Sequence, residues 1–146
     1  MVQRRELLSA ATRAAGLRRS GNGQPHLSEQ ARCALSAAKR QYRERRHREE
    51  LFGDNLFGDP VWDILLDLFV ATLEERQVPV TSACAAAIVP TTTAMRYLKH
   101  MQAANLIERV PHPKDSRCTI LELTPMALEK MLTHFSLAHF SLERGL

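Results

Sequence analysis

The sequence predicts a mainly α-helical domain that carries one small β-hairpin, an α+β fold. Apolar residues recur at helical spacing over residues 60–75 and again over residues 91–104. Two short β-prone runs, residues 106–110 and 118–123, enclose a turn-rich tip, which is the pattern of a hairpin. With 146 residues, of which 45% are hydrophobic and 25% charged, the chain is long enough for one domain with its own core.

Residues 1–28 are expected to be a flexible basic arm. Helix-breaking residues interrupt this stretch: Gly16, Gly21, Gly23 and Pro25. Residues 1–50 hold 12 Lys and Arg against 5 Asp and Glu, whereas residues 51–146 hold 8 against 11. The formal net charge of +4, with an isoelectric point near 9.3, therefore combines an excess of positive charge before residue 51 with a slight negative excess after it. An anionic partner is mildly favoured.

A charged helix is predicted over residues 29–52. Ser28 is suited to cap it, and its second half reads KRQYRERRHREE. Oppositely charged residues four positions apart support a continuous helix: Arg40 with Glu44, and Arg45 with Glu49. This helix is a possible dimer or DNA arm. It either adds phosphate contacts or is only a solvated support, and the sequence favours neither reading.

A repeated LFGD sequence separates this helix from the next one. In LFGDNLFGDP, residues 51–60, the glycines and the Asp-Pro pair end the charged helix. Asp59 is suited to cap the following helix, and Pro60 to occupy its first position. Residues 60–75 have a broad apolar face and are the predicted central core helix: Val61, Trp62, Leu65, Leu66, Leu68, Phe69 and Leu73.

Two further helices follow, joined by a tight turn. Thr81 or Ser82 is expected to cap the first, the Ala-rich SACAAAI, whose small side chains let two helices cross closely. Val89-Pro90 makes the turn to the helix over residues 91–104. The expected buried side of this second helix is formed by Ala94, Tyr97, Leu98 and Met101. Asn105 follows where a left-handed residue is required.

The final helix is predicted over residues 125–146, after the hairpin. Thr124 is suited to cap it, with Pro125 at its first position. Its apolar residues are more than a lone terminal helix can hide in a small domain: Met126, Leu128, Met131, Leu132, Phe135, Leu137, Phe140 and Leu142. A second copy of the chain is therefore expected to cover part of this C-terminal dimerisation helix.

The helix pair with its hairpin is the pattern of a protein that contacts two grooves of DNA. On the second helix, Thr92 and Thr93 can reach base edges or phosphates, and Arg96 can form two hydrogen bonds with one guanine. Lys99 and His100 lie further along, where phosphate contact is expected. Taken alone, these residues are more typical of the solvated face of an amphipathic helix. The short helix before them and the hairpin after them favour DNA.

The hairpin tip HPKDSR is the second indication of DNA binding. It places Lys114 and Arg117 beyond the body of the domain, where an arginine can enter a minor groove. Asp115 is expected to pair with an arginine and shape the loop. An ordinary polar turn would have the same composition, so the tip supports the interpretation only together with the helix pair.

From residue 62 to about residue 131 the chain resembles the MarR family of winged helix-turn-helix regulators. The resemblance rests on the segments SACAAAI, TTTAMRYLKHM, NLIER, KDSR and LELT. Its most specific part is formed by Asp115, Arg117, Leu123 and Thr124. The chain departs from the family where Asn105 and Ala127 replace common glycines, and the long basic stretch before residue 51 is atypical.

The resemblance implies a winged helix-turn-helix over residues 57–124 and a homodimer whose N- and C-terminal helices intertwine. It also implies that Thr92, Thr93 and Arg96 lie at recognition positions, and that Arg117 is the wing arginine.

Other functional classes have no support in the sequence. No apolar run of about 18 residues predicts a membrane span, and no apolar segment follows Arg4 as in a secretory signal. Cys33, Cys84 and Cys118 form no CxxC pair, which argues against a disulfide framework and a zinc site and suits a reducing cytoplasm. Structural cysteines are expected, with oxidant sensing as the less common alternative. No catalytic fingerprint is present, so no metal, cofactor or enzyme activity is predicted.

These features predict a cytoplasmic, homodimeric, sequence-specific regulator of transcription that binds double-stranded DNA. The recognition helix would enter the major groove and the wing the minor groove. No membrane partner is expected, and a small-molecule effector is compatible with this prediction although no residue identifies one. The alternative is a winged helix adaptor that binds protein without specific DNA binding. A positive surface joining Arg96, Lys99 and Arg117 would favour DNA over the adaptor.

Overall fold

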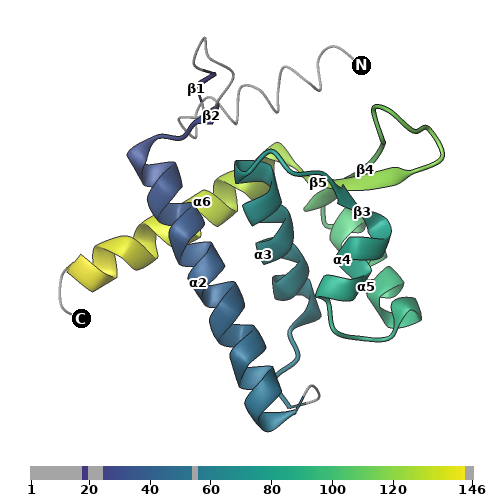
Figure 1. Cartoon of the computed structure of the whole chain (residues 1–146), viewed down its shortest axis with the longest axis horizontal. Coiled ribbons are helices and arrows are strands. Elements are labelled where there is room, and N and C mark those ends of the chain that lie inside the picture. Colours follow the sequence, from purple (N-terminus) through teal and green to yellow (C-terminus); the bar gives the residue numbers. More distant parts are fainter. Residues whose placement is uncertain (1–17, 20–24, 54–55, 144–146) are drawn as a thin grey trace.

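The computed structural model describes the backbone of residues 18–19, 25–53 and 56–143, and the side chains of residues 27–53 and 56–136. In this part of the chain there are five helices: α2 (Glu29–Phe52), α3 (Pro60–Leu73), α4 (Val80–Ala86), α5 (Thr91–Ala103) and α6 (Pro125–Glu143). Helix α3 lies between the long helix α2 and the α4–α5 pair, and α6 crosses behind α2 (Figure 1). The predicted mainly α fold with a small β-hairpin is confirmed.

A three-stranded antiparallel sheet lies beside the helix pair. Its strands are β3 (Val78–Pro79), β4 (Ile107–Pro111) and β5 (Thr119–Leu123), in the order β3-β5-β4. The hairpin β4–β5 pairs Ile107 with Leu123 and Pro111 with Thr119, so its tip is residues 112–118. Within the expected arm, β1 (Arg18–Arg19) pairs with β2 (Pro25–His26). The rest of the arm, residues 1–17 and 20–24, lies outside the described residues.

Helix α2 begins and ends as its sequence predicts. The Ser28 Oγ accepts a hydrogen bond from the Ala31 N–H at 3.1 Å, which is the predicted N-cap. Gly53 ends the helix at a φ of 96°, a conformation that glycine adopts without strain. One face of α2 is buried through small residues, which allow close packing on the neighbouring helices: Ala31, Ala34 and Ala38.

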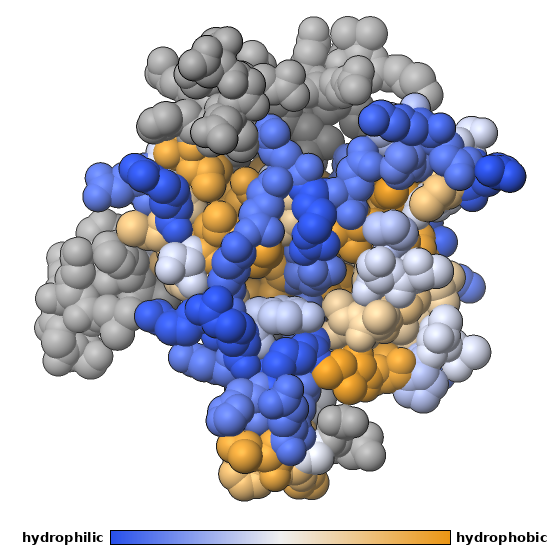
Figure 2. Space-filling model, in the orientation of Figure 1, coloured by the Kyte–Doolittle hydropathy of each residue, from blue (hydrophilic) through white to orange (hydrophobic). Residues whose placement is uncertain are grey.

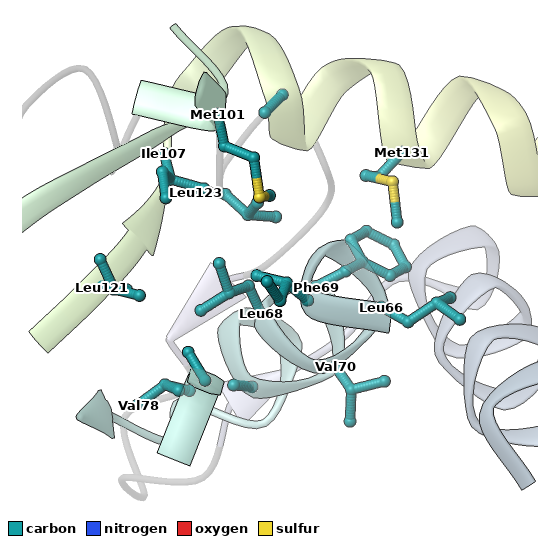
Figure 3. Close-up of a cluster of buried hydrophobic side chains, with 14 of the residues drawn as sticks. Leu66, Leu68, Phe69, Val70, Val78, Met101, Ile107, Leu121, Leu123 and Met131 are labelled. Carbon is teal, nitrogen blue, oxygen red and sulfur yellow. The ribbon is translucent and has the colours of Figure 1, made fainter. Parts of the chain in front are cut away.

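Helix α3 forms the centre of the core, as predicted. The Asp59 Oδ1 accepts a hydrogen bond from the Trp62 N–H at 3.3 Å, and Pro60 is the first helical residue. The helix ends at Leu73, slightly earlier than expected, and Glu75 then takes a left-handed φ of 54°. Figure 3 shows the α3 side chains together with residues of the sheet and of α5 and α6: Leu66, Leu68, Phe69, Met101, Ile107, Leu121, Leu123 and Met131.

The helix-turn-helix is formed by α4 and α5. The expected cap of α4 at Thr81 or Ser82 is wrong, because the helix begins at Val80 directly after strand β3 and has Pro79 in the cap position. The turn contains Ile88 at a φ of 47°. Helix α5 ends at Ala103, and Asn105 has the predicted left-handed φ, 56°.

Helix α6 begins at a cap that also joins it to the hairpin. The Thr124 Oγ1 accepts from the Ala127 N–H at 3.1 Å and donates to the Asn105 carbonyl at 2.7 Å. Among the described side chains of α6, four are buried within this chain: Ala127, Leu128, Met131 and Phe135. The side chains of Leu137, Phe140 and Leu142 lie outside the described residues. The dimerisation role of α6 therefore stays a prediction.

Candidate nucleic-acid interface

Helix α5 has one buried face and one polar, exposed face. Its buried residues are Ala94, Leu98 and Met101, and the fourth predicted residue, Tyr97, is half-buried. On the other face, Thr92, Arg96, Lys99 and His100 are exposed, and Thr93 is half-buried. Within the described part of the chain, the side chains of Arg96, Lys99 and His100 form no ion pair or hydrogen bond. These donors are available to a ligand.

The turn before α5 is packed through small and sulfur-containing side chains. Ala83, Cys84 and Ala87 are buried between α4 and its neighbours. The Cys84 Sγ lies 3.7 Å from the Met95 Sδ of α5, so this thiol belongs to the packing of the helix pair, as predicted. Cys33 is exposed and Cys118 half-buried, so only one of the three thiols is fully buried. The small contacts let α5 cross α4 closely.

Two side chains hold the backbone of the wing tip. The His112 Nδ1 accepts hydrogen bonds from the backbone N–H groups of Lys114, at 3.1 Å, and Asp115, at 3.2 Å. The Asp115 Oδ1 accepts from the Arg117 backbone N–H at 3.1 Å and from the Arg117 Nε at 3.2 Å. The predicted pairing of Asp115 with an arginine is confirmed. The role of His112 was not predicted, although a side-chain acceptor just before a polar turn is a recognisable turn signal.

The wing cations Lys114 and Arg117 project into solvent on the side of the molecule that carries α5. The Arg117 side chain is 91% exposed even with its Asp115 partner, and Lys114 is exposed. Figure 1 shows the hairpin and α5 on the opposite side of α3 from α2. The structure therefore places all seven predicted contact residues on one head, formed by α4, α5 and the hairpin.

Some arginines of α2 form ion pairs other than those that the sequence predicts. The Arg45 Nε donates to the Asp63 Oδ1 of α3 at 2.6 Å, so the expected pair of Arg45 with Glu49 is wrong. Glu49 is instead paired with Arg46, at 2.8 Å. The expected pair of Arg40 with Glu44 is present at 3.9 Å. Sequence could not reveal the Asp63 contact, because it depends on how α2 and α3 pack.

Helix α2 is thus a structural part of the domain and not a uniformly solvated helix. The hydrogen bond that Arg45 donates to Asp63 is the main cause that raises the pKa of Arg45, and it outweighs the opposing effect of burial. Lys39 forms an ion pair with Glu74 at the other end of the α2–α3 contact. Figure 2 shows hydrophilic side chains along α2 and an apolar area at its lower end. That area is formed by Leu51, Phe52, Leu56 and Phe57.

Two negative findings concern the described residues. None of their helices is long and apolar enough to cross a membrane. No three His, Cys, Asp or Glu side chains among them are arranged to hold a metal ion. The features that do stand out in this part of the chain are the exposed cations of α5 and of the wing.

Comparison with known proteins identifies the fold. No protein-family profile matches the chain, and no curated protein matches its sequence. The S. aureus MepR–DNA complex is similar in structure, with a TM-score of 0.50, 17% identity, and coverage of 76% of this chain and 83% of MepR. A mutant of S. aureus MepR bound to an oligodeoxyribonucleotide has a TM-score of 0.50 and 15% identity, covering 78% of this chain and 76% of that one. AF1382 of Archaeoglobus fulgidus has a TM-score of 0.48 and 18% identity, and the match covers 64% of this chain and 94% of AF1382.

At these identities the likeness concerns the fold alone. The chain has the winged helix-turn-helix fold of the MarR-like regulators.

Proposed function

We propose that the protein is a sequence-specific, double-stranded DNA-binding regulator of transcription that acts as a homodimer. The observation that carries this proposal is the exposed face of α5. Arg96, Lys99 and His100 stand there without partners in the described part of the chain. A helix that follows a tight turn and presents unpaired cations is suited to a major groove about 12 Å wide.

Each predicted contact residue has a role that its position supports. Thr92, Thr93 and Arg96 are near the N-terminal end of α5, which is the end that reaches base edges in helix-turn-helix proteins. Lys99 and His100 are further along and would contact phosphates. The wing residues Lys114 and Arg117 would enter or flank the adjacent minor groove.

The comparisons support the proposal from outside the site. The MepR structures that share this fold were determined with DNA or an oligodeoxyribonucleotide. In the proposed organisation, residues 57–124 form the DNA-binding unit and residues 125–146 the dimerisation helix, with residues 29–52 supporting the dimer and 1–28 as an arm. The protein would be cytoplasmic and would have no enzyme activity.

The experiment that tests this function is selection from a random duplex DNA library, followed by mobility-shift titration of the enriched sequence. We expect a pseudo-palindromic site with half-sites about one helical turn apart. Light scattering at micromolar concentration should give twice the chain mass of 16.5 kDa. Failure to enrich any sequence would contradict the DNA-binding function, and a monomer would contradict the two-half-site arrangement.

A second candidate function is protein binding, and one observation favours it. Leu51, Phe52, Leu56 and Phe57 are exposed near the end of α2, which is unusual for large apolar side chains in one place. An adaptor would bind its partner through this area and would not need Arg96. Partner capture that is lost in Leu56→Ser but unchanged in Arg96→Ala, together with no enriched DNA, would establish the adaptor function instead.

A further inference from the structure

The Arg46 side chain, which belongs to α2, has polar contacts with helices α2, α3 and α4. Its Nη1 donates to the Glu49 Oε2 on α2 at 2.8 Å. Its Nη2 lies 4.0 Å from the Asp63 Oδ1 on α3 and donates a short hydrogen bond to the Ala86 carbonyl at the end of α4. Its guanidinium also lies over the Tyr42 ring, 4.9 Å from the centroid. The side chain is 20% exposed, and Glu49 only 3%.

The contact with Ala86 lies where it can fix the start of the recognition helix. Ala86 is the last residue of α4, and its carbonyl is one of those that a helix end leaves without an internal partner. A cation at this end also complements the negative end of the helix dipole. Only the short turn with Ile88 separates Ala86 from Thr91, the first residue of α5. A change at the end of α4 therefore passes directly to α5.

The packing around α4 relies on small buried side chains, so a directional contact adds to the control of its orientation. The side chains that α4 and its turn bury are small: Ala83, Cys84, Ala86 and Ala87. Small apolar contacts restrict sliding and tilting less than interlocked large side chains. A guanidinium, in contrast, has a planar set of donors whose directions are fixed. Arg46 thus provides a directional connection between α2 and the helix pair.

We propose that Arg46 is a positioning residue that sets the orientation of α4 and α5 relative to α2, and through it the half-site spacing that the dimer recognises. This inference rests on the proposed function, because it requires a dimer that binds two half-sites. Two heads bound to one DNA molecule gain avidity only when their separation matches the half-sites. Arg46 affects that match although it does not contact DNA.

The test uses the full chain and the DNA sequence that the wild-type protein selects. Glu49 is buried, so removing Arg46 alone would leave an unpaired buried charge that could unfold the protein. The main variant therefore combines Arg46→Met with Glu49→Gln. Glu49→Gln alone is the matched control, because it keeps Arg46 and its contact with Ala86. Arg43→Met controls for loss of one positive charge from the same helix, since Arg43 is exposed and forms no ion pair with a described residue.

Binding is measured to the two-half-site duplex, to a duplex with one half-site, and to duplexes with one base pair inserted or removed between the half-sites. For the double variant, we expect affinity for the two-half-site duplex to fall about tenfold or more, and affinity for one half-site to stay within about twofold. The preference among spacings should also become flatter. Both control variants should keep the wild-type preference. Arg46→Lys, which retains the charge but not the fork of donors, should behave as the double variant does.

The results separate a positioning role from a purely structural one. An equal loss of affinity for one and two half-sites, or no loss for either, would overturn the proposal. The same spacing change in Arg43→Met would also overturn it, because charge alone would then be the cause. If the double variant is unfolded by circular dichroism, Arg46→Lys decides the question. A wild-type protein that selects no DNA or is monomeric would instead contradict the proposed function.

Discussion

Arg45 donates a hydrogen bond from its Nε to the Asp63 Oδ1 at 2.6 Å, and this contact joins α2 to the core helix α3. The Asp63 side chain is 1% exposed and the Arg45 side chain 13%. A carboxylate with so little access to water depends on its cationic partners, chiefly Arg45, because burial removes its hydration. The basic helix is therefore fixed to the domain by its own charges.

We expect Asp63→Ala to lower the free energy of unfolding by about 3–5 kcal/mol, because it leaves Arg45 without its partner in a largely buried position. Chemical denaturation followed by circular dichroism measures this change. Asp67→Ala is the matched control one turn further along α3. It removes a more exposed pair with Arg76, at 2.9 Å, and should cost about 0–1 kcal/mol. Equal losses for the two variants would contradict a special role of the buried pair.

The raised pKa of Arg45 predicts how the free energy of unfolding depends on pH. A cation whose pKa is raised on folding contributes stability that is fully present below its unfolded pKa and is lost as pH rises through its folded pKa. For an arginine that loss lies in strongly alkaline solution. The difference in unfolding free energy between the wild type and Arg45→Met should therefore be constant between about pH 6 and pH 9. A difference that shrinks within this range would mean that another titrating group controls the contact.

Local signals in the sequence predicted most helix ends, and tertiary contacts explain what was missed. Asn105 was predicted to be left-handed because Asn tolerates that conformation, and its φ is 56°. Ile88 adopts the same conformation with a φ of 47°, and no residue preference indicates it, since β-branched residues avoid positive φ. Only the requirement to turn between α4 and α5 explains it.

The candidate site shows the same division between local and long-range information. The exposed face of α5 follows from helical periodicity, so Arg96 and Lys99 could be placed from the sequence. The contacts of the α2 arginines could not be placed in this way, because they join residues far apart in the sequence. Arg45 and Asp63 are 18 positions apart, and Arg46 and Ala86 are 40 positions apart. Charge-rich sequence alone gave no sign that two arginines of this helix are paired inside the protomer.

Arg96→Ala tests base readout on α5. Loss of a guanidinium that bonds one base through two hydrogen bonds should weaken specific binding by about 1–3 kcal/mol and relax preference at that base. The unfolding free energy should not change, because Arg96 is exposed and unpaired within the described residues. Lys99→Ala is the comparison, since a phosphate contact weakens all sequences alike. A mobility-shift titration in which Arg96→Ala keeps the full sequence preference would show that Arg96 does not read bases.

His112→Ala tests whether the shape of the wing tip matters for binding. The variant loses the two hydrogen bonds that hold the backbone at Lys114 and Asp115. We expect DNA affinity to fall by about 1 kcal/mol, because the cations of a less ordered tip must be fixed on binding. Ser116→Ala, at an exposed position of the same tip, should have no effect. Wild-type affinity in His112→Ala, measured by fluorescence anisotropy, would exclude a role for the tip geometry.

Salt dependence distinguishes the wing from the basic helix as a DNA contact. Each phosphate neutralised by a cation contributes close to one unit to the slope of log K against log salt. Arg117 projects from the wing, whereas Arg43 lies on α2, and Figure 1 places α3 between α2 and the recognition helix. We therefore expect Arg117→Ala to reduce the slope by about one unit and Arg43→Ala to leave it unchanged.

Deleting residues 1–50 would not test this point, because it removes the contacts of Arg45 and Arg46 and so part of the fold. Point variants of the full chain keep the fold intact. A reduced slope for Arg43→Ala would mean that α2 does contact phosphate, and the basic helix would then be a second DNA-binding surface.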